Sequence, residues 1–189
     1  MAYSASPHAD VPDREALLQL ICFQVRGQDL ALPITAVKET IAPRPLTRLP
    51  LCPPCIAGLI NLRGEVVAVL DLGLLLGLPA VVPTPPHEAR IILLRSQRGP
   101  RSHGALCGIL VDRLTAPQRL PALRPLPPNL PEPAAAYVAG TARRLQEEGG
   151  QKHARLLLVL DPERLLAAEA LRPYRRAPEG DHVHGTPRS

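Results

Sequence analysis

The chain has 189 residues, of which 46% are hydrophobic, enough to bury the core of one good-sized domain or of two very small ones. Its 24 prolines and 13 glycines disfavour long helices, and its one Phe, three Tyr and no Trp leave an aliphatic core, so we expect a mostly β fold. The net charge of +5 comes from arginines scattered through the second half of the chain. Because a nucleic-acid interface gathers basic residues on one face, usually with aromatics, we expect no nucleic-acid partner.

The first ordered elements follow a loose N-terminal arm. Apolar and polar residues alternate over Leu20–Arg26, and a second apolar run covers Leu30–Leu32 after a Gly-Gln-Asp turn, which predicts a hairpin. Pro33 suits the first position of a helix, and three apolar residues follow at spacings of three and four: Ile34, Val37 and Ile41. We therefore predict a short helical turn here.

The centre of the chain holds its clearest pair of strands. A proline-rich connection, residues 42–55, leads into two apolar runs, Ala57–Arg63 and Val66–Leu70, separated by a polar hinge. Runs of this length bounded by Gly and charge predict a hairpin. The segment Gly73–Gly77 is too short for more than one helical turn, and a loop, Pro79–Pro86, follows.

Two further strand pairs are predicted in the second half. Ala89–Leu94 and Ala105–Val111 flank the polar loop Ser96–His103. Residues 117–133 hold many prolines and are expected to cross the surface as extended chain. The second pair consists of Tyr137–Arg143 and Leu156–Leu160.

A last helix is predicted after the strands. Asp161 offers an N-cap oxygen, Pro162 fits the first helical position, and the helix should run to about Leu171. Residues 1–15 and 173–189 lack apolar periodicity, so we expect disordered ends around one domain at residues 16–172. About nine short strands with two or three small helices favour barrels or a sandwich.

Neither a secretory signal nor a membrane span is predicted. The N-terminus has no basic stretch followed by an apolar one, and three charges interrupt the most apolar segment: Arg63, Glu65 and Asp71. We expect a cytoplasmic protein without direct membrane insertion, whose four cysteines remain thiols.

Cys52 and Cys55 form the one motif that could be catalytic. A CxxC pair is redox-active when a helix N-terminus lowers the pKa of its first thiol, whereas here a predicted strand follows. Zinc requires four ligands, and Cys22 and Cys107 stand alone in the sequence. Loop thiols without function are the favoured interpretation, and a thiol redox protein or sensor, or a regulatory disulfide, is the alternative.

The remaining polar residues do not assemble into a catalytic or metal site. His182 and His184 lie with Asp181 in the expected tail, and Asp71 and Asp112 each end an apolar run, where a carboxylate can cap the following turn. No phosphate-binding loop or Ser-His-Asp set is recognisable. We predict no enzyme activity, no cofactor and no metal.

Six collinear segments form a recognisable pattern. The strongest runs from Gly58 to Gly64 and continues through Val66–Leu72. It resembles the pattern G-x-x-N-L-R-G-x-x-x-P-x-x-D-L of the CheW-like family of bacterial chemotaxis coupling proteins. The others are Leu32–Glu39, Leu46–Pro50, Gly108–Asp112, Tyr137–Gly140 and Leu157–Asp161, which is followed by Leu165-Leu166. The chain departs from the pattern at Ala68, often Pro in the family, and at the two cysteines of the CxxC motif.

The resemblance implies a fold and a function. The fold would be two small five-stranded SH3-like β-barrels packed together. The function would be that of an adaptor without activity of its own, which bridges a CheA-type histidine kinase to the cytoplasmic tips of transmembrane chemoreceptors (methyl-accepting chemotaxis proteins). The protein would thus be part of a two-component signalling system and associate with membrane receptor arrays through its partners.

By matching positions, the resemblance places partner-binding roles on Val37, Glu39, Gly58 and Arg63. The family pairs the Glu and the Arg across its first barrel, close to the partner-binding surfaces. A structural role is equally open for Glu39 and Arg63, which could steady a turn, and is favoured for Gly58 and Gly64, which could serve only the backbone conformation.

Overall fold

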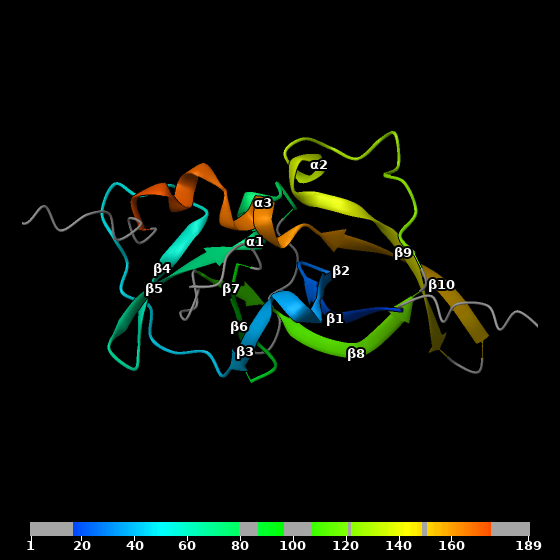
Figure 1. Ribbon diagram of the computed structural model, residues 1–189, viewed down its shortest axis with the longest axis horizontal. Coiled ribbons are helices and arrows are strands. Elements are labelled where there is room, and N and C mark those ends of the chain that lie inside the picture. Colours follow the sequence, from blue (N-terminus) through cyan, green and yellow to red (C-terminus); the bar gives the residue numbers. More distant parts are fainter. Residues whose placement is uncertain (1–16, 80–86, 97–106, 121, 149–150, 175–189) are drawn as a thin grey trace, which may run out of the picture.

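The computed structural model describes residues 17–79, 87–96, 107–120, 122–148 and 151–174, with the backbone alone for 145–148 and 151–152. Within these residues, ten strands and a few short helices follow one another (Figure 1). The strands are β1 Leu18–Val25, β2 Gln28–Pro33, β3 Val37–Ile41, β4 Ile56–Leu62, β5 Glu65–Asp71, β6 Arg90–Leu94, β7 Cys107–Val111, β8 Arg113–Leu120, β9 Val138–Glu148 and β10 Gln151–Leu160. The helices are η1 Ile34–Ala36, α1 Leu72–Leu75, α2 Ala134–Tyr137, α3 Pro162–Leu166 and η2 Glu169–Tyr174.

The strands form two five-stranded sheets. Sheet A has the order β8-β1-β2-β10-β9, and sheet B has the order β3-β6-β7-β5-β4. Sheet B is built from one continuous stretch of chain, whereas sheet A joins the first two strands to the last three. They are joined by the antiparallel pairing of β1 with β8 and by the parallel pairing of β2 with β10, and sheet B holds a parallel pair of its own, β5 with β7.

Each sheet curves around its own hydrophobic cluster. In sheet B, Ile41 of the edge strand β3 packs against the cluster that contains Ile60 and Leu62 of the opposite edge strand β4. In sheet A, Leu120 of β8 and Ala142 of β9 likewise share one cluster. Neither ladder of hydrogen bonds closes among the described strands, so the two units are strongly curved sheets. The predicted mostly β fold of two five-stranded SH3-like units is confirmed.

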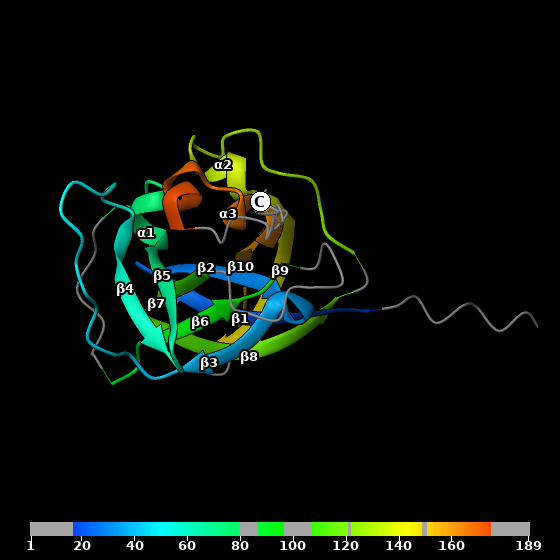
Figure 2. The same ribbon diagram turned by 60° about the vertical axis from the view of Figure 1, so that its left-hand side comes forward.

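A third and larger cluster joins the two sheets. It combines Phe23 and Leu32 of sheet A with Leu70 and Ile109 of sheet B and with Leu165 of α3. Figure 2 shows the two sheets packed together with the three α-helices gathered on one side of them. This arrangement buries both faces of the inner strands, which is why β5 and β6 are apolar nearly throughout. It also buries most of β1, where the predicted alternation of exposed and buried residues is not found.

Arg26 adds a polar connection at this junction. Its backbone N–H donates to Asp112 Oδ2 at 2.6 Å, and its guanidinium donates to Leu78 O at 2.7 Å and lies 3.3 Å from Asp71 Oδ2. Gly73 leaves room for this guanidinium, since a Cβ there would meet Arg26 Nε. Asp112 was predicted to cap the turn that follows it. Instead it accepts from the β1–β2 turn, a residue 86 positions earlier in the chain.

The predicted helical turn from Pro33 to Ile41 is wrong beyond its first residues. Only Ile34–Ala36 is helical, and Val37–Ile41 is the strand β3, which pairs with β6. The 3-and-4 spacing of apolar residues thus arose from a short turn followed by a half-buried strand. An edge strand with a register shift produces no clean alternation, so the sequence did not reveal it.

The Pro-rich segment 117–133 is only partly a surface loop. Its first residues belong to β8, which carries Pro117 at the edge of sheet A, the position in a sheet where a missing N–H is tolerated. Its end passes into the short helix α2, which was not predicted.

The C-terminal helix is shorter than predicted, although its start is as expected. Asp161 Oδ1 accepts from the N–H groups of Glu163 and Arg164, and Pro162 occupies the first turn. The helix ends at Leu166, and a 3₁₀ segment, Glu169–Tyr174, continues the chain.

Several expectations fall outside the described residues. These are the disordered N-terminal arm, the first residue of the expected domain (16), the expected tail beyond residue 174, most of the loops 79–86 and 96–103, and the metal-like group Asp181, His182 and His184. No helix of the described part of the chain is long and apolar enough to span a membrane.

Candidate partner-binding surface

The tip of the β4–β5 hairpin is a tight two-residue turn. Leu62 pairs with Glu65, and the two residues between them, Arg63 and Gly64, both have positive φ, 54° and 89°. This is the backbone of a type I′ turn, whose twist matches that of the flanking strands. Asn61 Oδ1 accepts the Gly64 N–H at 2.9 Å and secures the turn. The sequence Asn-Leu-Arg-Gly therefore places Arg63 at the outermost point of the hairpin.

The Arg63 side chain extends from the β4–β5 turn to β3, the opposite edge strand of sheet B. Its guanidinium lies 3.7 Å from Glu39 Oε2, on β3, and the side chains are 79% and 30% exposed. The two ends of the sheet order thus meet through one ion pair. An exposed pair of this kind contributes only about 0–1 kcal/mol to stability, so its contribution to the fold is small.

Val37 does not share this surface with Glu39. A register shift separates the two residues: Val37 pairs with Leu94, and Glu39 pairs with Leu93. Leu94 belongs to the cluster between the sheets and Leu93 to the cluster inside sheet B, so Val37 and Glu39 lie toward different faces. Half-buried Val37 packs against the central cluster, and the exposed Ile34 of η1 lies three residues before it.

Gly58 is buried and has a backbone role. Its φ is 153°, and a Cβ would lie 2.8 Å from Thr47 O and 2.9 Å from Leu46 Cβ. This close approach lets Thr47 and Leu59 exchange two backbone hydrogen bonds of 2.9 Å, which fix the proline-rich connection along the edge of β4. The structure therefore brings together Glu39 and Arg63, but not Val37 or Gly58.

Exposed apolar residues near the hairpin were not identified from the sequence. Val66, at the start of β5, is 67% exposed, and Leu51 in the preceding loop is fully exposed with a φ of 59°. Leu51 follows Pro50, and positive φ at this place in a turn is usually left to Gly or Asn. The sequence therefore did not predict the positive φ of Leu51, because leucine does not favour that conformation.

The cysteine pair does not form a redox-active arrangement. Cys55 is followed by β4 rather than by a helix, and burial, with the charge of Asp71 nearby, raises the pKa of its thiol. The Cys52 thiol donates to Leu49 O at 3.2 Å. Burial also raises the pKa of Cys22 to about 11 and that of Cys107 to about 12. The four cysteines are free thiols, and the described residues contain no group of three or more side chains suited to a metal.

Comparisons with known proteins match nearly all of the described chain. The family model described as CheW-like domain matches residues 19–170. The chemotaxis protein CheW of Rhizobium meliloti is 35% identical over 101 residues, which cover 53% of this chain and 63% of the relative. Protein FrzA of Myxococcus xanthus is 32% identical over 160 residues, 77% of this chain and 89% of that protein. The alignment thus spans less than two thirds of the Rhizobium protein.

A solved structure shows the same fold. The scaffolding protein TtCheW of Thermoanaerobacter tengcongensis superposes with a TM-score of 0.62 at 22% identity, over 82% of this chain and 90% of that one.

Proposed function

The chain belongs to the CheW-like domain family, and on that premise we propose that it is a chemotaxis scaffold without enzyme activity, which couples transmembrane chemoreceptors to a CheA-type histidine kinase. The proposal places it in the cytoplasm, associated with receptor arrays through its partners. Its role is to fix the relative geometry of receptor and kinase, so that a change in one reaches the other.

The observation that carries the proposal is the family match over residues 19–170, together with the hairpin tip that the family's strongest motif forms. Asn61–Gly64 presents an arginine at an exposed rim and connects it to Glu39 of the opposite edge. A charged pair at a rim adds little affinity, but it sets the orientation of a partner and disfavours wrong partners. Val66, which pairs with Asn61 beside this turn, and Ile34, in the η1 segment that links β2 to β3, are exposed apolar residues that can supply contact area.

The direct test is co-sedimentation with its partners. The full chain is mixed with its cognate kinase and with a receptor fragment bearing the cytoplasmic tip, separately and together. We expect binding to each and a ternary complex. Failure of the wild-type chain to bind either one would refute the proposal.

A charge reversal at the tip tests the site itself. Arg63→Glu should weaken assembly at least tenfold, because it places two carboxylates together at the rim. A matched control is Arg119→Glu, which makes the same change at an exposed position of β8 on the other sheet. Both variants should keep the circular dichroism spectrum of the wild type. If Arg63→Glu unfolds the protein, or if both variants assemble normally, Arg63 has no binding role.

A further inference from the structure

The β9–β10 hairpin extends well beyond the sheet to which it belongs. The two strands pair with each other from Val138 and Leu160 out to Glu148 and Gln151, whereas β2 pairs with β10 only at Leu158 and Val159. Among the described strands, the outer part of the hairpin is therefore a two-stranded ribbon, and it projects from the molecule in Figure 1. On β10 the described side chains of this part, from His153 to Leu156, are exposed, and on β9 Arg143 is exposed whereas Arg144 is half-buried near Asp29 of β2. A two-stranded ribbon is at most marginally stable alone, so it gains from pairing with another strand.

The other edges described in the two sheets are protected. Thr47 bridges β4, a register shift interrupts β3, and β8 carries Pro117 beside an irregular register with β1. On β9, Arg124 bridges Thr141, and the strand then continues to Glu148 without a bridge from another described residue. An unpaired edge of this kind is a template for another strand.

The hydrogen bonds at Thr141 reveal which residues of β9 have their backbone groups on the free edge. Thr141 N–H donates to Arg124 O at 2.9 Å, and Arg124 N–H donates to Thr141 O at 2.7 Å, so both backbone groups of Thr141 are directed away from β10. Successive residues of a strand alternate in this respect, and the pairing of β9 with β10 is regular from Thr141 onward. Arg143, Leu145 and Glu147 therefore present their N–H and C=O groups to the free edge.

These three positions are self-complementary. In an antiparallel pair of two copies of β9 centred on Leu145, Arg143 of each copy stands opposite Glu147 of the other, and Leu145 stands opposite Leu145. Opposite charges directly across an antiparallel pair are favourable, and like charges are unfavourable. The parity rule allows this register, because all three residues have their backbone groups on the same edge. It is also the symmetric register that uses the whole edge between the Arg124 bridge and the turn of the hairpin.

We propose that the free edge of β9, residues 143–147, pairs antiparallel with the same edge of a second copy of this chain, forming a two-fold symmetric dimer. The occupant is a second copy because Arg-x-Leu-x-Glu complements itself only when it is reversed, as a two-fold axis requires. The contact is small, so the dimer is weak and exchanges readily. The proposal does not depend on kinase or receptor binding, and it can fail while the scaffold function stands.

The test measures self-association of the full chain by sedimentation equilibrium, from about 1 µM to about 1 mM, the range expected for a small interface. Wild type should form a dimer, and Arg143→Glu and Glu147→Arg should each raise the dimer Kd about tenfold or more, because each places two like-charged pairs at the contact. An equimolar mixture of the two variants should form a heterodimer, since one copy then carries two arginines and the other two glutamates. The variant with both substitutions should regain the homodimer with its charges exchanged.

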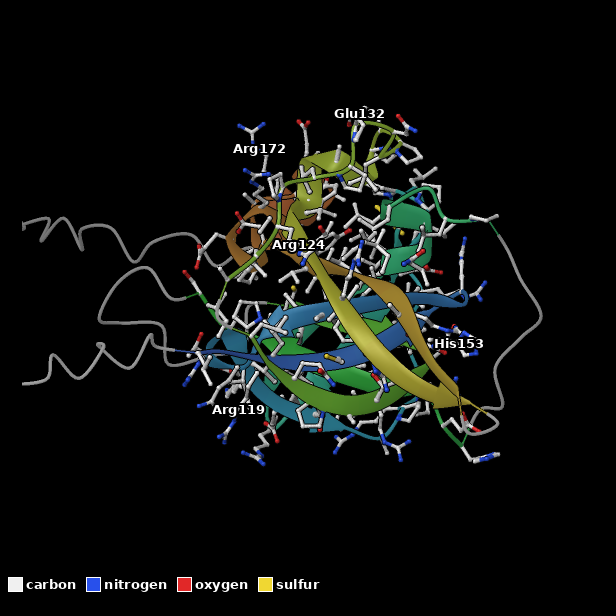
Figure 3. All side chains as sticks on the ribbon, turned by 90° about the vertical axis from the view of Figure 1, so that its right-hand side faces the viewer. Arg119, Arg124, Glu132, His153 and Arg172 are labelled. Carbon is white, nitrogen blue, oxygen red and sulfur yellow. The ribbon has the colours of Figure 1, made fainter. Side chains whose placement is uncertain are left out.

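A matched control and the opposing results complete the design. Arg119→Glu changes the same charge on β8, the other edge of sheet A, and should leave the dimer Kd unchanged (Figure 3). Circular dichroism of every variant checks folding. A wild-type chain that stays monomeric at about 1 mM overturns the proposal, as does a dimer that both single substitutions leave intact. Restoration in the mixture excludes simple unfolding of the hairpin as the cause of the loss.

Discussion

Sheets A and B are two versions of one arrangement. In sheet B an edge strand is followed by a proline-rich segment that bridges β4 at Thr47, then by the hairpin β4–β5, and then by a helix capped by Asp71. In sheet A the edge strand β8 is followed by a proline-rich segment that bridges β9 at Arg124, then by the hairpin β9–β10, and then by a helix capped by Asp161. A glycine, Gly58 or Gly140, lies directly before the bridged residue of each strand. A Cβ at either glycine would clash with the proline-rich segment that forms the bridge.

The difference between the two units lies in their interiors and their hairpins. The cluster inside sheet B consists of aliphatic residues alone. Inside sheet A, Gln24 Nε2 donates to buried Asp29 at 2.7 Å, and Arg144 lies 3.8 Å from the same carboxylate. The hairpin of sheet B ends in a tight turn that carries Arg63, whereas that of sheet A runs on as a ribbon with a free edge. The same arrangement therefore supports two different surfaces, and only one of them is presented by the family's strongest motif.

The largest expected effect comes from breaking the polar interior of sheet A. Asp29→Ala leaves Gln24 without its acceptor and Arg144 without its ion-pair partner, and it should lower the free energy of unfolding by about 4 kcal/mol. Chemical denaturation measures this loss. The double variant Asp29→Ala/Arg144→Leu should be less destabilised than the sum of its single variants, because the unpaired charge is removed as well. Additive losses would show that the two residues do not interact.

The next largest effects are expected at the two glycines beside the bridges. Gly58→Ala should lower the free energy of unfolding by about 3 kcal/mol, because both a positive φ and a 2.8 Å contact oppose the new methyl group. Gly140→Ala should cost about 2 kcal/mol, because only the 2.9 Å contacts oppose it. Thermal unfolding of the two variants checks the order. Equal losses of stability in Gly58→Ala and Gly140→Ala would mean that the positive φ of Gly58 adds no strain. Gly27→Ala serves as the control for positive φ alone, because no atom lies near the added methyl group.

Alkaline pH should lower the free energy of unfolding through two buried thiols, Cys22 inside sheet A and Cys107 between the sheets. The pKa of Cys22 is raised to about 11 and that of Cys107 to about 12, both above the ordinary 9.0 of the unfolded chain. Below pH 9 both states hold the proton, whereas above it the unfolded state loses its proton first, so stability falls as pH rises. By pH 10 each thiol should have lowered the free energy of unfolding by about 1 kcal/mol.

Comparison with single Cys→Ala variants isolates this effect from that of other groups titrating at high pH. Cys22→Ala, inside sheet A, and Cys107→Ala, between the sheets, should each show a shallower decline of the free energy of unfolding between pH 8.5 and about 10 than the wild-type chain. A decline as steep as that of the wild type in both variants would contradict the expected thiol contribution.

The smallest effect on stability is expected at the hairpin tip of sheet B. Arg63→Ala removes an exposed ion pair and should change the free energy of unfolding by no more than about 1 kcal/mol. Urea denaturation checks this value beside that of Asp29→Ala. A loss as large as that of Asp29→Ala would make Arg63 a structural residue and would weaken its assignment to partner binding.

Strands with strong local signals were predictable from the sequence. The β4–β5, β6–β7 and β9–β10 hairpins follow from apolar runs bounded by Gly and charge, and the caps at Asp71 and Asp161 follow from an acidic residue placed before a short helix. Strands β3 and β8 were missed. Both lie at sheet edges, where half-exposed residues, a register shift or a proline obscure the period of two.

The sequence by itself determined the fold class, the family motifs and the identity of the turn that carries Arg63, because apolar periodicity and turn chemistry are local properties of the chain. Tertiary structure alone decided that β1 and β2 join the last strands of the chain, that Asp112 accepts from Arg26, and that Val37 lies toward another face than Glu39. These contacts join residues far apart in sequence, and they depend on how each sheet curves and on where its register shifts, neither of which a local pattern specifies.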